Sequence, residues 1–407
     1  MGSAPGRADL LNTHQDYKGL PVVSAALSLR TRIYAEINST GLYKIKSLAL
    51  DLEDEFPPPK VGDKMQLKGK GWFGDYFRAV SQVLLTPRLH DESLGFSATV
   101  YSEVPVSSGL ASSAAIEVAF ASLLNRIYSL GLDRKGLAES AYQAERNVMG
   151  IPCGRLDQYG SALGGIAIIE NKPPYRSQSI SGQGINLIVV DSGIKHSTGL
   201  IHPLRQKEMQ TALEELIQAG AQLPEKYYQV NWETLSEDYL TKYFASLSEI
   251  SKKRILFTLR MQKSTEIALS VLKGNQVLPN PPPGLETSGK NKIERLGKVM
   301  HYQHELLRDY YDVSTPELER IRQAMESSGA IGVKISGSGM GGSLIGLLPP
   351  GTNGKIVIDS ALALGAKAGW ITRIAGGEIS RGTEKIFNSN GEGVKSEGEG
   401  MDGPLGL

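Results

Sequence analysis

The sequence has little of what marks secreted, membrane-spanning or nucleic-acid-binding proteins. Cys153 is the only cysteine, which excludes an intramolecular disulfide framework and a cysteine-rich zinc site. No apolar run approaches the roughly 18 residues that a spanning helix needs, and no signal-peptide core precedes Arg7. The 44 basic and 43 acidic side chains balance, so no overall field attracts nucleic acid or an anionic membrane. We therefore predict a cytoplasmic protein that acts on small molecules, with no nucleic-acid or membrane partner.

The length of 407 residues predicts two domains of ordinary size. A proline- and glycine-containing break over 171–184 places their boundary near residue 180, which gives an N-terminal domain over 1–180 and a C-terminal domain over 181–388. Residues 389–407 continue with glycine, serine and charge but no apolar periodicity, which predicts a disordered tail. The oligomeric state does not follow from these features, and a monomer is compatible with them.

The stretch Pro105-Val-Ser-Ser-Gly-Leu-Ala-Ser-Ser-Ala114 is the strongest candidate for a binding loop. It lies between an alternating apolar run, 96–106, and a run with helical spacing, 114–130. In a strand–loop–helix arrangement, the loop N–H groups and the helix N-terminus converge on one point and favour an anion such as phosphate. The same residues also fit a plain turn in which Ser112 or Ser113 caps the helix.

A second polar cluster lies at the N-terminus. Arg7, His14 and Asp16 fall within ten residues, and the glycine and proline around them predict a loop over 4–19 before a strand at 21–37. Mixed charged and neutral groups on a loop suit a ligand with several hydroxyls. A solvated surface turn is the alternative.

Two further glycine-rich segments follow. Asp157 lies in 151–165 just before a buried-looking strand at 166–169, so its carboxylate is predicted at the mouth of a strand, although a turn-forming aspartate would also fit. Residues 334–343 carry four glycines within six positions between two strands. So many glycines allow close backbone approach, either to a bound nucleotide or to the first loop.

The remaining periodicity is mainly helical. Helical spacing covers 72–85, a helix capped by Asp133 with Glu145 near its end, and then 203–219, 232–273, 290–310 and 315–327. The six histidines show no metal-binding pattern, and we interpret His301 and His304 as part of a solvated helix face.

Three loops together resemble the three motifs of the GHMP kinases, and the first resembles the galactokinase signature. They are Gly6-Arg-Ala-Asp-Leu-Leu-Asn-Thr-His-Gln-Asp-Tyr17, Gly109-Leu-Ala-Ser-Ser-Ala114 and Gly337-Ser-Gly-Met-Gly-Gly342. Pro152-Cys-Gly-Arg-Leu-Asp-Gln158, Lys195-His-Ser197 and the segment 307–318 are similar to further galactokinase segments. The resemblance runs in the family's order from residue 4 to about residue 348.

The resemblance implies a two-domain α+β kinase that uses ATP and Mg²⁺, with the active site in the cleft between the domains. It assigns catalysis to Asp157 with Arg7 beside it, and Mg²⁺ to Ser113 and Glu145. It assigns the sugar to Thr13, His14, Asp16, Gly154 and His202. It assigns the nucleotide to Ser107, Ser108, Gly109, Leu110, Ala111, Ser112, Ser113, Ala114, Gly337 and Gly339.

Departures from the galactokinase pattern leave the sugar open. Thr13 stands where a glutamate is usual, His202 where a sugar-contacting tyrosine is usual, and Arg155 where the residue is usually apolar. Galactose, a uronic acid such as galacturonate, and L-arabinose are the alternatives, because Thr13 cannot repel a carboxylate and Arg155 would attract one. A different class, a non-catalytic sugar and ATP sensor, is disfavoured because the known sensors lack the Ser113-Ala114 pair.

Overall fold

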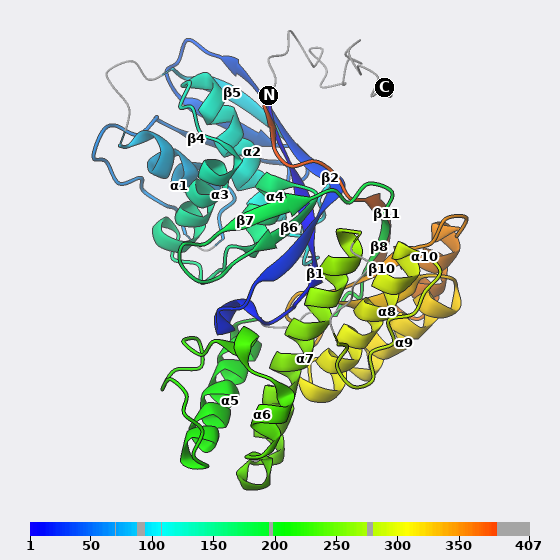
Figure 1. The fold of residues 1–407 in the computed structure, drawn as a ribbon. Coiled ribbons are helices and arrows are strands. Elements are labelled where there is room, and N and C mark those ends of the chain that lie inside the picture. The colour runs from blue at the N-terminus through cyan, green and yellow to red at the C-terminus, as the bar shows by residue number, and fades with distance from the viewer. Residues whose placement is uncertain (70, 88–93, 107, 195–197, 275–279, 381–407) are drawn as a thin grey trace, which may run out of the picture.

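Two β-sheets organise the chain in the computed structural model, which describes residues 1–407 except 70, 88–93, 107, 195–197, 275–279 and 381–407. The first sheet has the order β12-β1-β2-β5-β3-β4, and β6 and β7 extend it from β2 (Figure 1). Its strands are β1 Gly2–Leu11, β2 Val22–Ile37, β3 Tyr43–Ser47, β4 Leu52–Phe56, β5 Phe96–Ser102, β6 Ile166–Ile169, β7 Ser177–Ile180 and β12 Ile379–Ser380.

Four helices pack with the first sheet. They are α1 Gly74–Leu85, α2 Ser112–Ile127, α3 Arg134–Gln143 and α4 Leu156–Leu163, and a π-helical turn, Ala144–Val148, follows α3. The first part of β2 is buried on both faces, whereas its second part alternates, because helices and the second sheet cover only the first part. The fully buried β1 therefore runs through the middle of the molecule.

The second sheet has the order β11-β8-β10-β9 and is covered by the C-terminal helices. Its strands are β8 Asn186–Asp191, β9 Ile331–Ser336, β10 Ser343–Leu348 and β11 Ala368–Arg373. The accompanying helices are α8 Lys292–Glu305, α9 Pro316–Ser327 and α10 Gly354–Ala363, with a π-helical turn, Leu306–Tyr310, after α8. Helices α5 Thr198–Gln218, α6 Glu237–Thr241 and α7 Glu249–Leu272 form a third group at the lower end of Figure 1.

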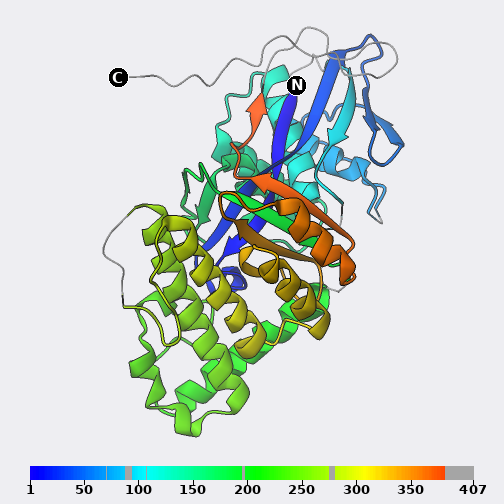
Figure 2. The ribbon, with the colours of Figure 1, turned by 90° about the vertical axis from the view of Figure 1, so that its right-hand side faces the viewer.

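The chain returns to the first sheet after β11. The Ala375 N–H donates to the Ala26 carbonyl at 3.0 Å, and β12 then pairs with β1. Figure 2 shows this orange-red strand beside the blue β1. The chain passes from the first sheet to the second between residues 180 and 186, near the predicted domain boundary. Its last described strand, β12, nevertheless belongs to the first sheet.

Several sequence predictions need correction. Residues 4–11 lie in β1 and not in a loop, because the run is buried and pairs with β2 throughout. The helix predicted over 232–273 starts at Glu249, where Ser248 caps it. His304 is fully buried against Glu319 and is not part of a solvated face. Strands β7, β11 and β12 and helices α4 and α10 were not predicted, and Asp157 lies in the first turn of α4 and not at the mouth of a strand.

The predicted tail over 389–407 and the segment 195–197 lie outside the described residues. In the part of the chain that the structure describes, no helix has the length and apolar character to cross a membrane.

Candidate active site

An ion pair joins the first strand to the fourth helix. Arg7 on β1 donates through Nε and Nη2 to the Asp157 Oδ1 of α4, at 3.0 and 2.7 Å. Gly160 makes this approach possible, since a Cβ there would lie 2.2 Å from the Ser24 hydroxyl on β2. Because both contacts end on Oδ1, Oδ2 is left for another donor, and the Asp157 side chain is 31% exposed. The two residues predicted for catalysis thus meet across 150 positions of sequence.

The glycine loop is fixed to the same arginine. Arg7 Nη1 donates to the Gly109 carbonyl at 2.7 Å, and the Arg7 backbone N–H donates to the Leu110 carbonyl at 3.0 Å. The loop therefore lies directly beside Asp157. Ser107 is outside the described residues, whereas Ser108 is buried in the loop.

The N-terminus of α2 is suited to an anion. Ala111 precedes it in the left-handed conformation, with φ of 55°, and no side-chain cap bond is present there among the described residues. Helices α3, α7, α8, α9 and α10 each have such a cap. Helix α2 begins with Ser112, Ser113 and Ala114, and the uncapped backbone N–H groups of this first turn are donors of the kind that a phosphate needs. A strained residue held at such a position is typical of functional sites.

Acidic side chains gather beside Ser113. The Glu145 carboxylate accepts from Gln158 Nε2 at 2.5 Å, and the Ser113 side chain is near enough to favour its ionised form and so to lower its pKa. The same nitrogen donates to Glu117 Oε2 at 3.2 Å. Burial and then the nearby Glu145 raise the pKa of Glu117 well above its usual range, and burial and then Asp157 raise the pKa of Glu145.

This donor set fits Mg²⁺. Hydroxyl and carboxylate oxygens are its preferred ligands, and it retains several non-protein ligands. The described residues contain no group of three or more His, Cys, Asp or Glu that could hold a metal ion. Glu117 Oε1 and Gln158 Oε1 are buried without a partner in the described part of the chain.

The predicted sugar residues also come together. The His14 and His202 rings lie 5.3 Å apart in an edge-on arrangement, and a Cβ on Gly154 would lie 3.1 Å from Asp16 Oδ2. Burial raises the pKa of Asp16, an effect that His202 opposes, and burial lowers the pKa of His202, an effect that Asp16 opposes. The segment that follows β1, helix α5 and the segment before α4 thus form one group.

Thr13 differs from the others. It is 2% exposed, and its hydroxyl accepts from Lys334 Nζ at 3.0 Å. The same ammonium donates to the Asp9 carbonyl at 3.0 Å. Burial lowers the pKa of Lys334 to about 8. The Thr13 hydroxyl is therefore already engaged beneath the loop.

The third glycine segment lies between the other two loops. Ser343 donates to the Ser108 carbonyl, and His14 contacts the Ser338 carbonyl at 3.0 Å. Only glycine fits at position 339, since a Cβ there would lie 2.4 Å from the Val313 carbonyl oxygen. A Cβ on Gly337 would meet open space, so this glycine borders room for a ligand.

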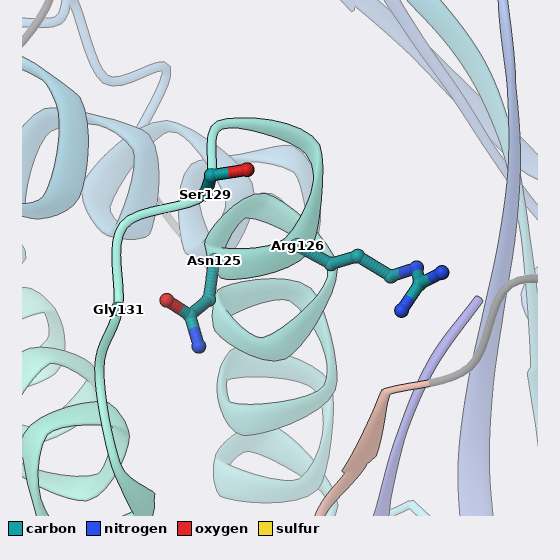
Figure 3. A pocket seen from close by; sticks show the side chains of 4 residues that line it. All are labelled: Asn125, Arg126, Ser129 and Gly131. Carbon is teal, nitrogen blue, oxygen red and sulfur yellow. The ribbon is translucent and has the colours of Figure 1, made fainter.

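Two features lie apart from the site. Arg155 is bound by Glu139 at 3.0 Å through two nitrogens and stacks on Tyr142 and Tyr175. A surface hollow of about 510 Å³ is lined by Asn125, Arg126, Ser129 and Gly131. Figure 3 shows these four residues around the end of α2. The hollow lies at the C-terminal end of α2, whereas the glycine loop is at the N-terminal end, so it is not the phosphate site.

Three family descriptions match the chain. "GHMP kinases N terminal domain" matches residues 75–165, "GHMP kinases C terminal" matches 285–371, and "Galactokinase galactose-binding signature" matches 1–36. The chain belongs to the GHMP kinases. Membership implies ATP as the phosphoryl donor. The first glycine loop and Asp157 lie within the N-terminal match. Gly337 and Gly339 of the third glycine segment lie within the C-terminal match.

Several curated relatives of this GHMP kinase are galactokinases. The galactokinase of Canis lupus familiaris is 27% identical over 360 residues, 85% of this chain and 83% of its own, and that of Thermococcus kodakarensis is 28% identical, covering 86% and 89%. The Lactococcus lactis galactokinase complexed with galactose has a TM-score of 0.71 at 21% identity, covering 93% of this chain and 94% of its own. The Methanococcus jannaschii mevalonate kinase scores 0.64 at 20% identity, covering 92% and 98%. The fold is that of these kinases, and the chain is a galactokinase-like sugar kinase.

The sequence interpretation missed several residues of the site. Glu117 interrupts an apolar helical face one turn after Ser113, a signal that could have been noticed. Gln158 directly follows Asp157. Tyr17, Tyr311 and Ser338 lie within the quoted motifs but were given no role; Tyr17 contacts His14 from the same loop, and Tyr311 and Ser338 reach Tyr17 and His14 from distant positions.

Proposed function

We propose that this GHMP kinase transfers the γ-phosphoryl group of ATP to the C1 hydroxyl of a galactose-type sugar. The observation that carries the proposal is the position of Arg7, which binds both the Asp157 carboxylate and the Gly109 carbonyl of the phosphate loop. A hydroxyl bound at Asp157 would face a phosphate at the N-terminus of α2. Phosphoryl transfer depends mainly on this kind of positioning.

Each residue has a distinct role in the proposed reaction. Asp157 Oδ2 accepts the hydrogen of the attacking hydroxyl, and the Arg7 guanidinium supports the charge of the migrating group. The N–H groups at the start of α2 hold the phosphates. Mg²⁺, held by Ser113 and Glu145, supplies further positive charge when bound.

A neutral sugar fits the remaining groups better than a uronic acid. Asp16, His202 and the backbone at Gly154 offer acceptors and donors for hydroxyls, and an ionised Asp16 would repel a carboxylate. Arg155, which would have attracted a carboxylate, is occupied by Glu139. The exposed Asp157 carboxylate and the uncapped α2 also favour catalysis over a sensor that only binds.

A substrate panel tests the proposal. ADP release should be measured with galactose, L-arabinose, galacturonate and methyl galactoside, and the product identified by phosphorus–proton coupling at C1. We expect turnover with galactose and none with methyl galactoside, whose C1 oxygen is blocked. Galacturonate turnover above that of galactose would refute the neutral-sugar assignment, and sugar binding without ADP release for any sugar would support the sensor class.

A further inference from the structure

The start of α4 is tied to α3, its neighbour in Figure 1, by the side chain of Arg155. Arg155 is the residue before the first turn of α4, and its backbone carbonyl accepts from the Tyr159 N–H at 3.1 Å. Its Nε and Nη2 donate to the two carboxylate oxygens of Glu139 on α3, both at 3.0 Å. A paired contact between a planar guanidinium and a planar carboxylate fixes orientation as well as distance.

Glu139 receives hydrogen bonds from both helices. Tyr159, one turn into α4, donates through its hydroxyl to Oε2 at 2.9 Å. Gln143, one turn further along α3, donates through Nε2 to Oε1 at 2.7 Å. Burial acts to raise the pKa of Glu139, but the hydrogen bonds, that of Arg155 first, outweigh burial and lower the pKa below its ordinary value. The carboxylate is therefore ionised at neutral pH, and its contact with Arg155 is an ion pair.

Two tyrosine rings complete the contacts of the arginine. The Arg155 Cζ lies 4.2 Å from the ring centroid of Tyr142 on α3 and 3.9 Å from that of Tyr175. Tyr175 belongs to the connection between β6 and β7, so a third element of the first domain holds the guanidinium. We call this set the Arg155 clamp: Glu139, Tyr142, Arg155, Tyr159 and Tyr175.

The clamp joins the two segments that carry the proposed metal and catalytic carboxylates. Helix α3 continues without a break into the π-helical turn that contains Glu145. Asp157 follows Arg155 in the first turn of α4. On the inner side, Gln158 of α4 joins the same two segments by donating to Glu145 at 2.5 Å. The two segments are thus tied twice, once within the site and once by the partly exposed clamp.

Asp157 depends on a restraint of this kind because Arg7 holds only one of its oxygens. Both Arg7 contacts end on Oδ1, so the direction of Oδ2 also depends on where the backbone of α4 begins. Gly154, which we place beside the sugar, directly precedes Arg155. A displaced start of α4 would therefore move the proposed sugar contact and the catalytic oxygen together.

We propose that Arg155 is a positioning residue whose clamp fixes the start of α4 and so aims the Asp157 carboxylate at the acceptor hydroxyl. The role of Asp157 in this proposal rests on the proposed function. The galactokinase pattern usually has an apolar residue at position 155, and an apolar side chain cannot pair with Glu139. The clamp is therefore a feature of this chain, and Arg155 acts on the reaction only through its neighbours.

Hydrogen–deuterium exchange on the full chain tests the clamp without any need for turnover. Arg155→Met removes the guanidinium and keeps a long apolar side chain. Arg32→Met is the matched control, because Arg32 forms a partly exposed ion pair with Glu103 on the first sheet at 3.0 Å. We expect faster exchange within residues 151–163 in Arg155→Met and wild-type exchange there in Arg32→Met. Wild-type exchange in Arg155→Met, or a rise spread over both sheets, would overturn the proposal.

Kinetics of the same variants test the consequence at the site. We expect kcat to fall about tenfold in Arg155→Met, with a higher KM for galactose, because a reacting group that is slightly misplaced loses much of its effect. The KM for ATP and the Mg²⁺ requirement should stay unchanged, since α2 and the π-helical turn carry those groups. A lower kcat with every KM unchanged would indicate only a loss of folded enzyme and would overturn the proposal.

A double-variant cycle tests whether Arg155 acts through Glu139. Glu139→Ala should lower kcat in the same way, and the double variant should be no slower than the slower single variant, because both changes remove one contact. Effects that multiply would show that Arg155 acts by another route. If the wild type has no kinase activity, the proposed function fails, whereas the exchange data still decide whether Arg155 fixes the start of α4.

Discussion

The two sides of Asp157 differ in charge. On the phosphate side, Glu117 and Glu145 lie close together and share the single amide nitrogen of Gln158. On the sugar side, the His14, Tyr17 and His202 rings contact one another, and Asp16 is the acidic side chain beside His202. Excess negative charge suits a site that receives a cation, whereas neutral donors and acceptors suit hydroxyls.

Burial acts on the two sides in the same physical way but with different results. It disfavours the charged form, so it raises the pKa of Glu117 and Glu145 and lowers the pKa of His14 and His202. A metal ion would reverse the effect on the acids, whereas the neutral histidines need no ion. Under the proposed function, a cation would complete the phosphate side, whereas the sugar side would need none.

The largest expected effect is at the residue between the two sides. Asp157→Asn keeps the shape and removes the charge that accepts the hydroxyl hydrogen. We expect kcat to fall at least about 100-fold, the lower part of the range for general-base catalysis, with the ATP Kd retained. Steady-state kinetics and calorimetry measure both, and near-normal turnover would falsify the catalytic role.

On the phosphate side, Glu145→Ala removes one oxygen ligand and should raise the Mg²⁺ concentration needed for half-maximal rate and lower turnover, with the fold intact. Glu139→Ala is the matched control, because Glu139 is also acidic but binds Arg155. Unchanged Mg²⁺ dependence in Glu145→Ala would remove Glu145 from the metal site.

Gln158→Leu tests whether orientation of Glu145 matters as well as its presence. The leucine keeps the approximate size of the Gln158 side chain but loses the hydrogen bond that orients the Glu145 carboxylate. We expect Mg²⁺ affinity to fall about 10- to 100-fold, the usual range for partners of metal ligands. Mn²⁺ binding in the presence of ADP, followed by electron paramagnetic resonance, measures it, and an affinity equal to the wild type would show that Gln158 only packs.

On the sugar side, Lys18→Met should change stability in a pH-dependent way. Burial lowers the pKa of Lys18 well below 10.5, so the unfolded state binds more protons between that lowered pKa and 10.5. The free energy of unfolding of the wild type should therefore rise with pH relative to that of the variant across this window. Urea titrations at several pH values measure the difference, and a flat difference would place the Lys18 ammonium in a more favourable environment than burial implies.

The smallest effect is expected for Thr13→Glu. Since Thr13 is buried and bound to Lys334, a carboxylate there would meet the lysine first. We expect the ratio of kcat/KM for galacturonate over galactose to change little from a low wild-type value. Selective loss of galacturonate turnover in the variant would instead show that this loop sets the sugar specificity.

The sequence alone determined the features that depend on near neighbours. The strand–loop–helix around Gly109 and the helix with Glu145 near its end follow from local periodicity and turn residues. Three short motifs in the family's order were enough to place the chain among the GHMP kinases. The strand over 4–11 was missed because local turn residues were given more weight than burial, which the sequence does not show.

Only the tertiary structure decided which of these residues meet. Arg7 and Asp157 are 150 positions apart, and His14 and Ser338 are 324 apart. Arg155 is bound by Glu139 and Thr13 by Lys334, and no local pattern in the sequence indicates either partner. Local rules reach only a few residues along the chain, whereas the partner of a buried polar group is set by which strands and helices pack together, and burial makes that partner obligatory.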